Sequence, residues 1–134
     1  MRAIKIDARE KTVTEVEVPP GTSTLTFMQQ VVGGFIETAR NFHEDQAGPG
    51  CFDTVYVNEE GLLHGDTSCW FTWDGAHQPF VGNGVVMGVD ADGETTSPTC
   101  TLEEARAAVK FLSREDVRRL FERATSNMVV GDAE

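Results

Sequence analysis

Apolar residues along the chain follow two kinds of spacing, one typical of strands and one typical of helices. Residues 3–6 and 12–18 are rich in Ile and Val and flank a polar connector, which predicts a hairpin at the start of the chain. Ser23 or Thr24 can cap a short helix that follows the hairpin. The apolar side chains of that helix recur every three or four residues and therefore share one face: Leu25, Phe27, Met28, Val31 and Val32.

The middle of the chain predicts further strands separated by turns. Three segments carry the β-branched and aromatic residues typical of strands: residues 35–40, 54–57 and 81–89. Residues 41–52 are rich in Gly, Pro and acids and are expected to form a loop. Leu62 and Leu63 follow a turn signal, so we expect them to return beside residues 54–57 as a strand.

The C-terminal part of the chain is predicted to be helical. Thr101 and Glu104 form the S/T-x-x-E pattern of a capping box. Apolar residues then recur at helical spacing, and Ser113 with Asp116 repeats a start signal. We therefore expect a helix pair, or one bent helix, over residues 102–124.

These elements predict an α+β fold. The expected sheet is mixed or mostly antiparallel and has four to six strands, with one short helix after the first hairpin and a C-terminal helix pair. A chain of 134 residues has the usual size of one domain. We expect a compact α+β domain over residues 1–99, a helical extension packed on it over residues 100–125, and a flexible tail over residues 126–134.

The cysteine content and the apolar runs indicate where the protein resides. Cys51, Cys69 and Cys100 include no CxxC pair, and the chain opens without the apolar run of a secretion signal. A reducing cytoplasm is therefore the expected compartment. No apolar run approaches the roughly 20 residues of a membrane-spanning helix, so no membrane association is expected.

Charge is distributed unevenly along the chain. Residues 41–105 contain twelve Asp or Glu and no Lys or Arg, and the formal net charge of the chain is −11. Nucleic-acid binding draws most of its affinity from Lys and Arg, so a direct nucleic-acid ligand is not expected. A partner protein with a basic surface fits this charge better. The oligomeric state stays open, with a homodimer through the C-terminal helices as one option.

Three short segments resemble a known family in their order and spacing. They are residues 32–37 (VGGFIE), 57–63 (VNEEGLL) and 81–88 (VGNGVVMG). The family, domain of unknown function 3846, comprises small uncharacterised proteins of bacteria, phages and mobile elements. The resemblance covers about residues 3–95 and implies a compact fold and a mobile-element setting. It supplies no catalytic residue, because its segments are typical of turns and strands.

One interpretation of the candidate chemistry is a small metal-dependent or cysteine hydrolase that uses His, Cys and Asp side chains of residues 43–77. The side chains available to it include His43, His64 and His77, with Cys51 and Cys69 as nucleophiles or metal ligands. None of these residues shows the CxxC or HxxxH spacing of a preformed zinc site. No cofactor, metal ligand or catalytic residue is assigned from the sequence.

The leading hypothesis is an acidic accessory protein of a phage or mobile element that binds a host protein and inhibits or modulates it. The host protein could belong to a nucleic-acid-binding defence complex, as for anti-CRISPR or anti-restriction proteins, with carboxylates mimicking phosphates. Trp70, Phe71 and Trp73 are most simply core residues. Strand alternation sends Trp70 and Trp73 to opposite sides, so the alternative is that one Trp lies outside the core and anchors the partner. The predicted partner-binding residues are Glu44, Asp45, Asp53, Glu59, Glu60, Asp66, Asp74, Trp70 and Trp73.

Overall fold

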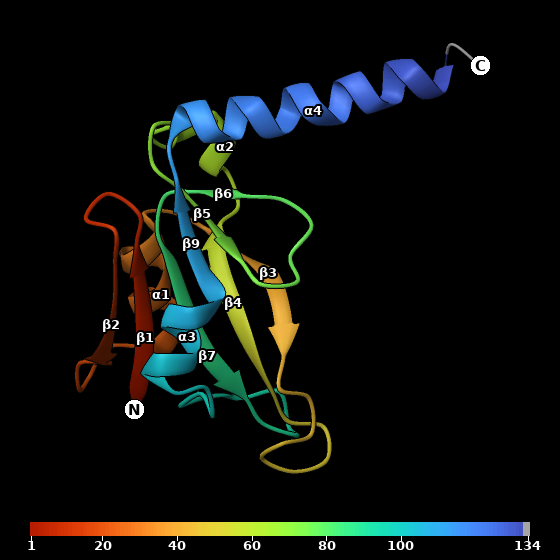
Figure 1. Cartoon of the computed structure of the whole chain (residues 1–134). Coiled ribbons are helices and arrows are strands. Elements are labelled where there is room, and N and C mark those ends of the chain that lie inside the picture. Colours follow the sequence, from red (N-terminus) through yellow and green to blue (C-terminus); the bar gives the residue numbers. More distant parts are fainter. Residues whose placement is uncertain (133–134) are drawn as a thin grey trace.

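The computed structural model describes residues 1–132, with side chains for residues 1–63 and 65–123. The described residues form nine strands and four helices (Figure 1). In chain order these are β1 (Arg2–Asp7), β2 (Thr12–Glu17), α1 (Thr24–Val32), β3 (Ile36–Phe42), β4 (Phe52–Asn58), α2 (Gly61–His64), β5 (Trp70–Trp73), β6 (Phe80–Val81), β7 (Gly84–Val89), β8 (Thr95–Thr96), α3 (Leu102–Ala108), β9 (Val109–Leu112) and α4 (Arg114–Asp132).

The larger sheet is antiparallel throughout and has β7 at its centre. Its strand order is β2-β1-β7-β4-β3, and β8 pairs with the end of β7. In register, Val86 of β7 lies between Ile4 of β1 and Val55 of β4. All three side chains are fully buried, so the apolar pairs across the strands fix the register of the sheet. The predicted α+β class with an antiparallel sheet is confirmed.

Helix α1 covers one face of this sheet. Ser23 accepts a hydrogen bond from the Thr26 amide as the N-cap, and Gly33 ends the helix in a left-handed conformation at φ 81°. The face that α1 buries carries Phe27 and Met28, which pack with Met87 and other residues of the sheet. The amphipathic stripe read from the sequence is therefore the packing face of α1.

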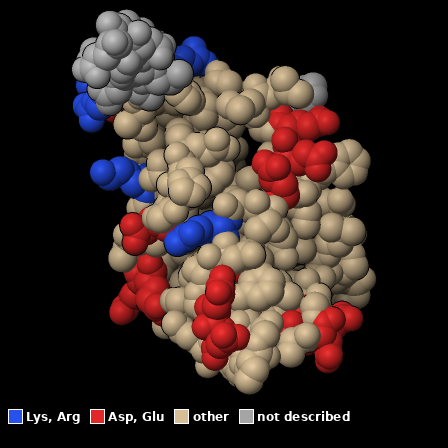
Figure 2. All heavy atoms as spheres, turned by 90° about the vertical axis from the view of Figure 1, so that its right-hand side faces the viewer, with Lys and Arg blue, Asp and Glu red and all other residues tan. Residues whose placement is uncertain are grey.

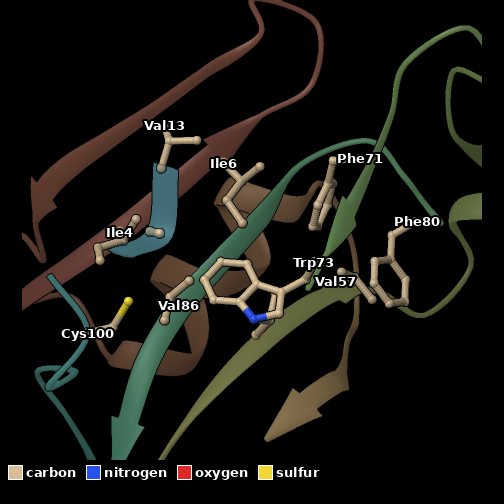
Figure 3. Packing of buried hydrophobic residues seen from close by; sticks show 11 residues of the cluster. Ile4, Ile6, Val13, Val57, Phe71, Trp73, Phe80, Val86 and Cys100 are labelled. Atoms are coloured by element: carbon tan, nitrogen blue, oxygen red, sulfur yellow. The ribbon is translucent and has the colours of Figure 1, made fainter. Parts of the chain in front are cut away.

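A second, smaller sheet covers the opposite face. Its order is β6-β5-β9, and together with α3 it forms the third layer of the fold (Figure 1). Phe71, Trp73 and Phe80 point from this layer toward Val57 and Val86 of the larger sheet (Figure 3). Both faces of β7 are therefore buried.

The C-terminal segment differs from the predicted helix pair at one place. Val109–Leu112 is a strand, β9, which pairs antiparallel with β5. The capping box at Thr101 starts α3 as predicted, and the helix ends where β5 offers an unpaired edge to the β-branched and aromatic residues that follow. Cys100 and Ala105 are fully buried in the core, so this segment contributes to the main fold.

Leu62 and Leu63 do not form the strand that we expected. They lie in the short helix α2, and their side chains are 67% and 77% exposed. The edge of β4 at which they would have paired is already occupied, because β3 and β7 flank β4 on both sides.

Helix α4 leaves the body of the protein and projects from it (Figure 1). Its first turns are fixed by Val117, which is buried against Trp70 and Val81. The segment 126–134, expected as a flexible tail, is helical as far as Asp132, and residues 133–134 lie outside the described residues. None of the helices within residues 1–132 has the length and apolar character needed to cross a membrane.

The contact between Gly84 and Phe71 gives a test of the layered core. A Cβ added at Gly84 would lie 2.7 Å from Cζ of Phe71, which is fully buried and has little room to move. Gly84→Ala should therefore lower the free energy of unfolding by about 1–3 kcal/mol, measured by urea titration. In a Phe71→Leu background, which removes that ring atom, the same substitution should cost less. Equal costs in both backgrounds would contradict the packing described here.

Candidate functional site

Three large apolar side chains are exposed at one end of the larger sheet. Phe35 is 65% exposed, Leu62 67% and Leu63 77%. The Phe35 carbonyl accepts a hydrogen bond from the Glu59 amide at 2.9 Å, which extends the β3–β4 ladder by one residue and places Phe35 next to the turn before α2. We call the surface formed by Phe35, Leu62, Leu63, Glu37, Glu59 and Glu60 the α2 corner.

Asn58 fixes the backbone of the α2 corner. Its side-chain amide donates to the Val32 carbonyl at 3.2 Å, and its side-chain oxygen accepts from the Glu60 amide at 2.8 Å. The end of α1 and the turn before α2 are thereby tied to one side chain. A Cβ at Gly34 would lie 2.8 Å from the Asn58 amide nitrogen, so a glycine there lets the two segments approach.

A cavity of about 270 Å³ opens beside Leu62 and Leu63. Phe80 and Val81, both buried, belong to its lining. Its described lining residues include three glutamates, those of the α2 corner, and no Lys or Arg. The α2 corner thus combines exposed apolar side chains, a hollow large enough for a side chain, and negative charge.

The acidic residues predicted to bind a partner are not all in one place. Glu59 and Glu60 lie in the α2 corner, whereas Glu44 and Asp45 lie in the loop at the other end of β3 and β4. Asp74 is exposed in the connection from β5 to β6. On the face seen in Figure 2, the acidic side chains form separate groups with uncharged surface and basic side chains between them.

Asp66 holds a turn next to α2. Its carboxylate accepts hydrogen bonds from the Ser68 amide at 3.0 Å and the Ser68 hydroxyl at 2.6 Å, and these bonds lower the pKa of Asp66 to about 2. Arg9 lies 3.5 Å from the same carboxylate. Asp66 is therefore exposed and charged, and part of its hydrogen-bonding capacity is used within its own loop.

Asp53 is not a surface residue, which corrects its predicted role in partner binding. It is 1% exposed, and its carboxylate accepts hydrogen bonds from the Thr99 amide at 2.9 Å, the Thr99 hydroxyl at 2.7 Å and the Cys100 amide at 2.8 Å. His43 Nδ1 lies 2.9 Å from the same carboxylate. This buried carboxylate joins β4 to the segment that leads into α3, because its donors come from that segment.

His43 links two carboxylates. Its Nε2 lies 3.2 Å from Glu104, which also accepts the Thr101 amide in the capping box of α3, and that backbone hydrogen bond lowers the pKa of Glu104. The backbone of His43 has a φ of 54°, a left-handed conformation that is uncommon outside glycine. Its contacts with Asp53 and Glu104 therefore stabilise a local conformation that would otherwise be unfavourable.

Trp70 and Trp73 are 6% and 5% exposed, so neither is the exposed anchor that we expected. They do lie on opposite faces of β5, as strand alternation requires. Trp73 packs in the main core, while Trp70 packs against Val81 and Val117. The sequence-based expectation was wrong because α4 covers the second face of β5.

The hydrolase interpretation uses His, Cys and Asp side chains of residues 43–77, and of these the His64 side chain lies outside the described side chains. Both ring nitrogens of His43 lie within hydrogen-bonding distance of carboxylates, so neither is directed at an open site. Cys69, one of the two proposed nucleophiles, donates from Sγ to the Asp66 carboxylate at 3.5 Å. Among the described side chains, no three His, Cys, Asp or Glu are grouped so that they could hold a metal ion.

Four residues of the α2 corner were absent from the predicted site: Phe35, Glu37, Leu62 and Leu63. The sequence pattern places Phe35 and Glu37 in the strand over residues 35–40, and it places the two leucines in a strand beside residues 54–57. One signal was available in the sequence, because two leucines after a tight turn are too few for a strand of usual length.

The hydrogen bonds to the buried Asp53 carboxylate predict that a conservative substitution at this position strongly lowers the free energy of unfolding. Asp53→Asn keeps one acceptor oxygen but sets an NH₂ donor against a backbone N–H, that of Thr99 at one oxygen position or that of Cys100 at the other. The free energy of unfolding should fall by about 3 kcal/mol, measured by urea titration. Asp74→Asn, at an exposed position, serves as the control and should change it by less than about 0.5 kcal/mol. Similar losses for the two variants would show that Asp53 is not a structural carboxylate.

The cysteines should differ in reactivity. Cys51 and Cys69 are partly exposed and Cys100 is buried, with its pKa raised to about 12. Iodoacetamide at mildly alkaline pH should modify the first two in the native protein and all three in denaturant, as counted by mass spectrometry. Rapid modification of Cys100 under native conditions would contradict its placement in the core.

Comparison with known proteins gives one match. No curated protein and no solved structure matches the chain. Residues 1–110 match the family described as Domain of unknown function (DUF3846), and this match extends beyond the resemblance over residues 3–95 to include α3 and the start of β9. The three segments that carried the resemblance meet at the end of α1, where Asn58 donates to the Val32 carbonyl and Asn83 to the Val31 carbonyl. The first two segments supply Gly34 and all six residues of the α2 corner. Since the match covers most of its length, the chain belongs to the DUF3846 family.

Proposed function

We propose that this protein is a non-enzymatic binding protein and that the α2 corner is its docking surface. The proposed partner is a protein with an apolar side chain that enters the cavity beside Leu62 and Leu63 and with Lys or Arg around it. The observation that carries the proposal is the exposure of Phe35, Leu62 and Leu63 beside an acid-lined cavity. Large apolar side chains gathered on a surface are typical of interaction sites.

The apolar and acidic parts of the α2 corner have different roles in this proposal. Burial of Leu62, Leu63 and Phe35 supplies the affinity, because apolar contacts at the centre of an interface carry most of its energy. Glu37 and Glu59 lie around them and select for a basic partner. Rim charges of this kind speed the encounter and add modest affinity that salt reduces.

This proposal narrows the hypothesis made from the sequence. The partner is still a protein with a basic surface, but the binding residues are those of the α2 corner, and Asp53, Trp70 and Trp73 are excluded because they are buried. Inhibition of a host protein, phosphate mimicry, a phage or mobile-element origin and a cytoplasmic location stay predictions. Phosphate mimicry would require nucleic acid to compete with this protein for the same partner.

Substitutions in the α2 corner test the proposal. A partner captured from a lysate of the encoding organism is identified by mass spectrometry, purified and titrated by calorimetry. Leu62→Ser combined with Leu63→Ser should raise the dissociation constant at least about thirtyfold, the equivalent of roughly 2 kcal/mol. Glu59→Gln with Glu60→Gln should weaken binding at low salt and have little effect at high salt.

The matched control is Leu25→Ser, because Leu25 is 50% exposed on α1, outside the α2 corner. This variant should bind the partner as the unmodified protein does. All variants should keep the unmodified circular dichroism spectrum. Undiminished binding by the Leu62 and Leu63 variant would refute the assignment of the docking surface.

A further inference from the structure

Strand β9 forms the edge of the smaller sheet and has one unpaired side. The sheet order is β6-β5-β9, so β5 pairs with one side of β9, and no strand within residues 1–132 pairs with the other. The Asp74 amide donates to the Ala108 carbonyl at 3.0 Å, and hydrogen-bonded pairs alternate along an antiparallel ladder. Lys110 and Leu112 therefore direct their backbone N–H and C=O groups to β5. Phe111, which lies between them, directs both of its groups to the unpaired side.

Two hollows border the unpaired side of β9, which lies between α3 and α4 (Figure 1). The first, the β2–β9 cavity, has a volume of about 440 Å³, and its lining includes Val13, Val109 and Phe111. The second, the β9–α4 groove, has a volume of about 600 Å³, and Phe111 lines it as well. An extended segment that paired with Phe111 would therefore have one row of its side chains at each hollow.

Basic side chains outnumber acids around both hollows. Lys11 and Arg106 line the β2–β9 cavity, whose described lining includes no acid. The lining of the β9–α4 groove includes one acid, Asp116, and three cations: Lys110, Arg119 and Arg123. Among the described residues, no ion pair includes Lys110 or Arg123. In a protein with a formal net charge of −11, this edge is a local site for an anionic ligand.

The two hollows would select different side chains. Val109 and Phe111 pack against the main core, so a side chain directly opposite Phe111 would lie against the apolar wall of the β2–β9 cavity. The next side chain along the segment points to the opposite side, toward the cations of the β9–α4 groove. The edge therefore matches a strand in which apolar and acidic residues alternate.

We propose that β9 binds an extended acidic segment of a partner protein, which pairs antiparallel with β9 and becomes a fourth strand of the three-stranded smaller sheet. The Phe111 N–H and C=O supply backbone hydrogen bonds, and the cations of the β9–α4 groove select Asp or Glu at alternate positions. Nucleic acid would satisfy the cations but would leave the Phe111 backbone groups and the apolar wall unused. The surface shares no residue with the α2 corner, so the protein would join a basic partner at one surface to an acidic partner at the other.

Backbone methylation of a synthetic peptide separates strand pairing from charge attraction. The probe is a fluorescein-labelled peptide in which Glu and Val alternate, titrated with the full chain by fluorescence anisotropy. In an antiparallel pair, Phe111 and the Val opposite it exchange both hydrogen bonds, so the Val N–H groups point to β9 and the Glu N–H groups point away. N-methylation of the Val residues should therefore weaken binding at least about tenfold. N-methylation of the Glu residues should leave the dissociation constant nearly unchanged.

Substitutions then locate the peptide on the protein. Lys110→Gln combined with Arg123→Gln should raise the dissociation constant of the Glu–Val peptide at least about tenfold, because the acidic side chains lose their partners. The matched control is Lys5→Gln combined with Arg118→Gln, which removes the same charge from cations outside both hollows that already lie near acids. This control should bind the peptide as the unmodified protein does. All variants should keep the unmodified circular dichroism spectrum.

Three results would overturn the proposal. The first is the absence of binding up to millimolar Glu–Val peptide. The second is equal binding of the peptides with and without methylated Val, or equal effects of the two double variants. The third is tighter binding of a thymidine oligonucleotide than of the peptide, which would assign the cations to nucleic acid.

Discussion

Burial of both faces of β7 is the constraint on which the rest of the structure depends. Val85 and Met87 face α1, and Val86 faces the smaller sheet, so this strand must be covered twice. An antiparallel sheet often leaves one face exposed to solvent, whereas this sheet is covered on both faces at its central strand. Helix α1 covers one face of β7, and β5 with the segment after β8 covers the other. Gly84 belongs to the same constraint, because the ring of Phe71 occupies the space next to it.

The same constraint decides where charge can lie. With the sheet covered on both sides, the acidic residues are placed at strand ends, in turns and on outer edges. Asp53 is the exception, and its four hydrogen-bonding partners compensate for the loss of water. The result is a set of separate acidic groups, of which the one at the α2 corner lies beside exposed apolar side chains. Negative charge is spread over much of the protein, but its combination with exposed apolar side chains and a cavity is local.

Much of the fold could be predicted because several elements are specified by residues that are neighbours in the sequence. The hairpin, α1 with its Ser23 cap and the start of α3 at Thr101 each follow from a few neighbouring residues. The strand β9 could not be predicted in this way, because it depends on the edge of β5, which is distant in sequence. The burial of Trp70 depends on Val117 for the same reason. The candidate site was harder to predict than the fold. Asp53 and Glu59 are both carboxylates in the sequence, and only the folded structure shows that Asp53 is buried and Glu59 exposed.

The central claim is that a partner docks on the α2 corner. Hydrogen–deuterium exchange of the protein with and without its captured partner tests this claim without any substitution. The account predicts slower exchange in the complex at Phe35 and over residues 59–63, the segments that would be covered. Protection confined to the acidic loops 44–51 and 90–94, with unchanged exchange at residues 59–63, would contradict it and would favour binding through charge alone.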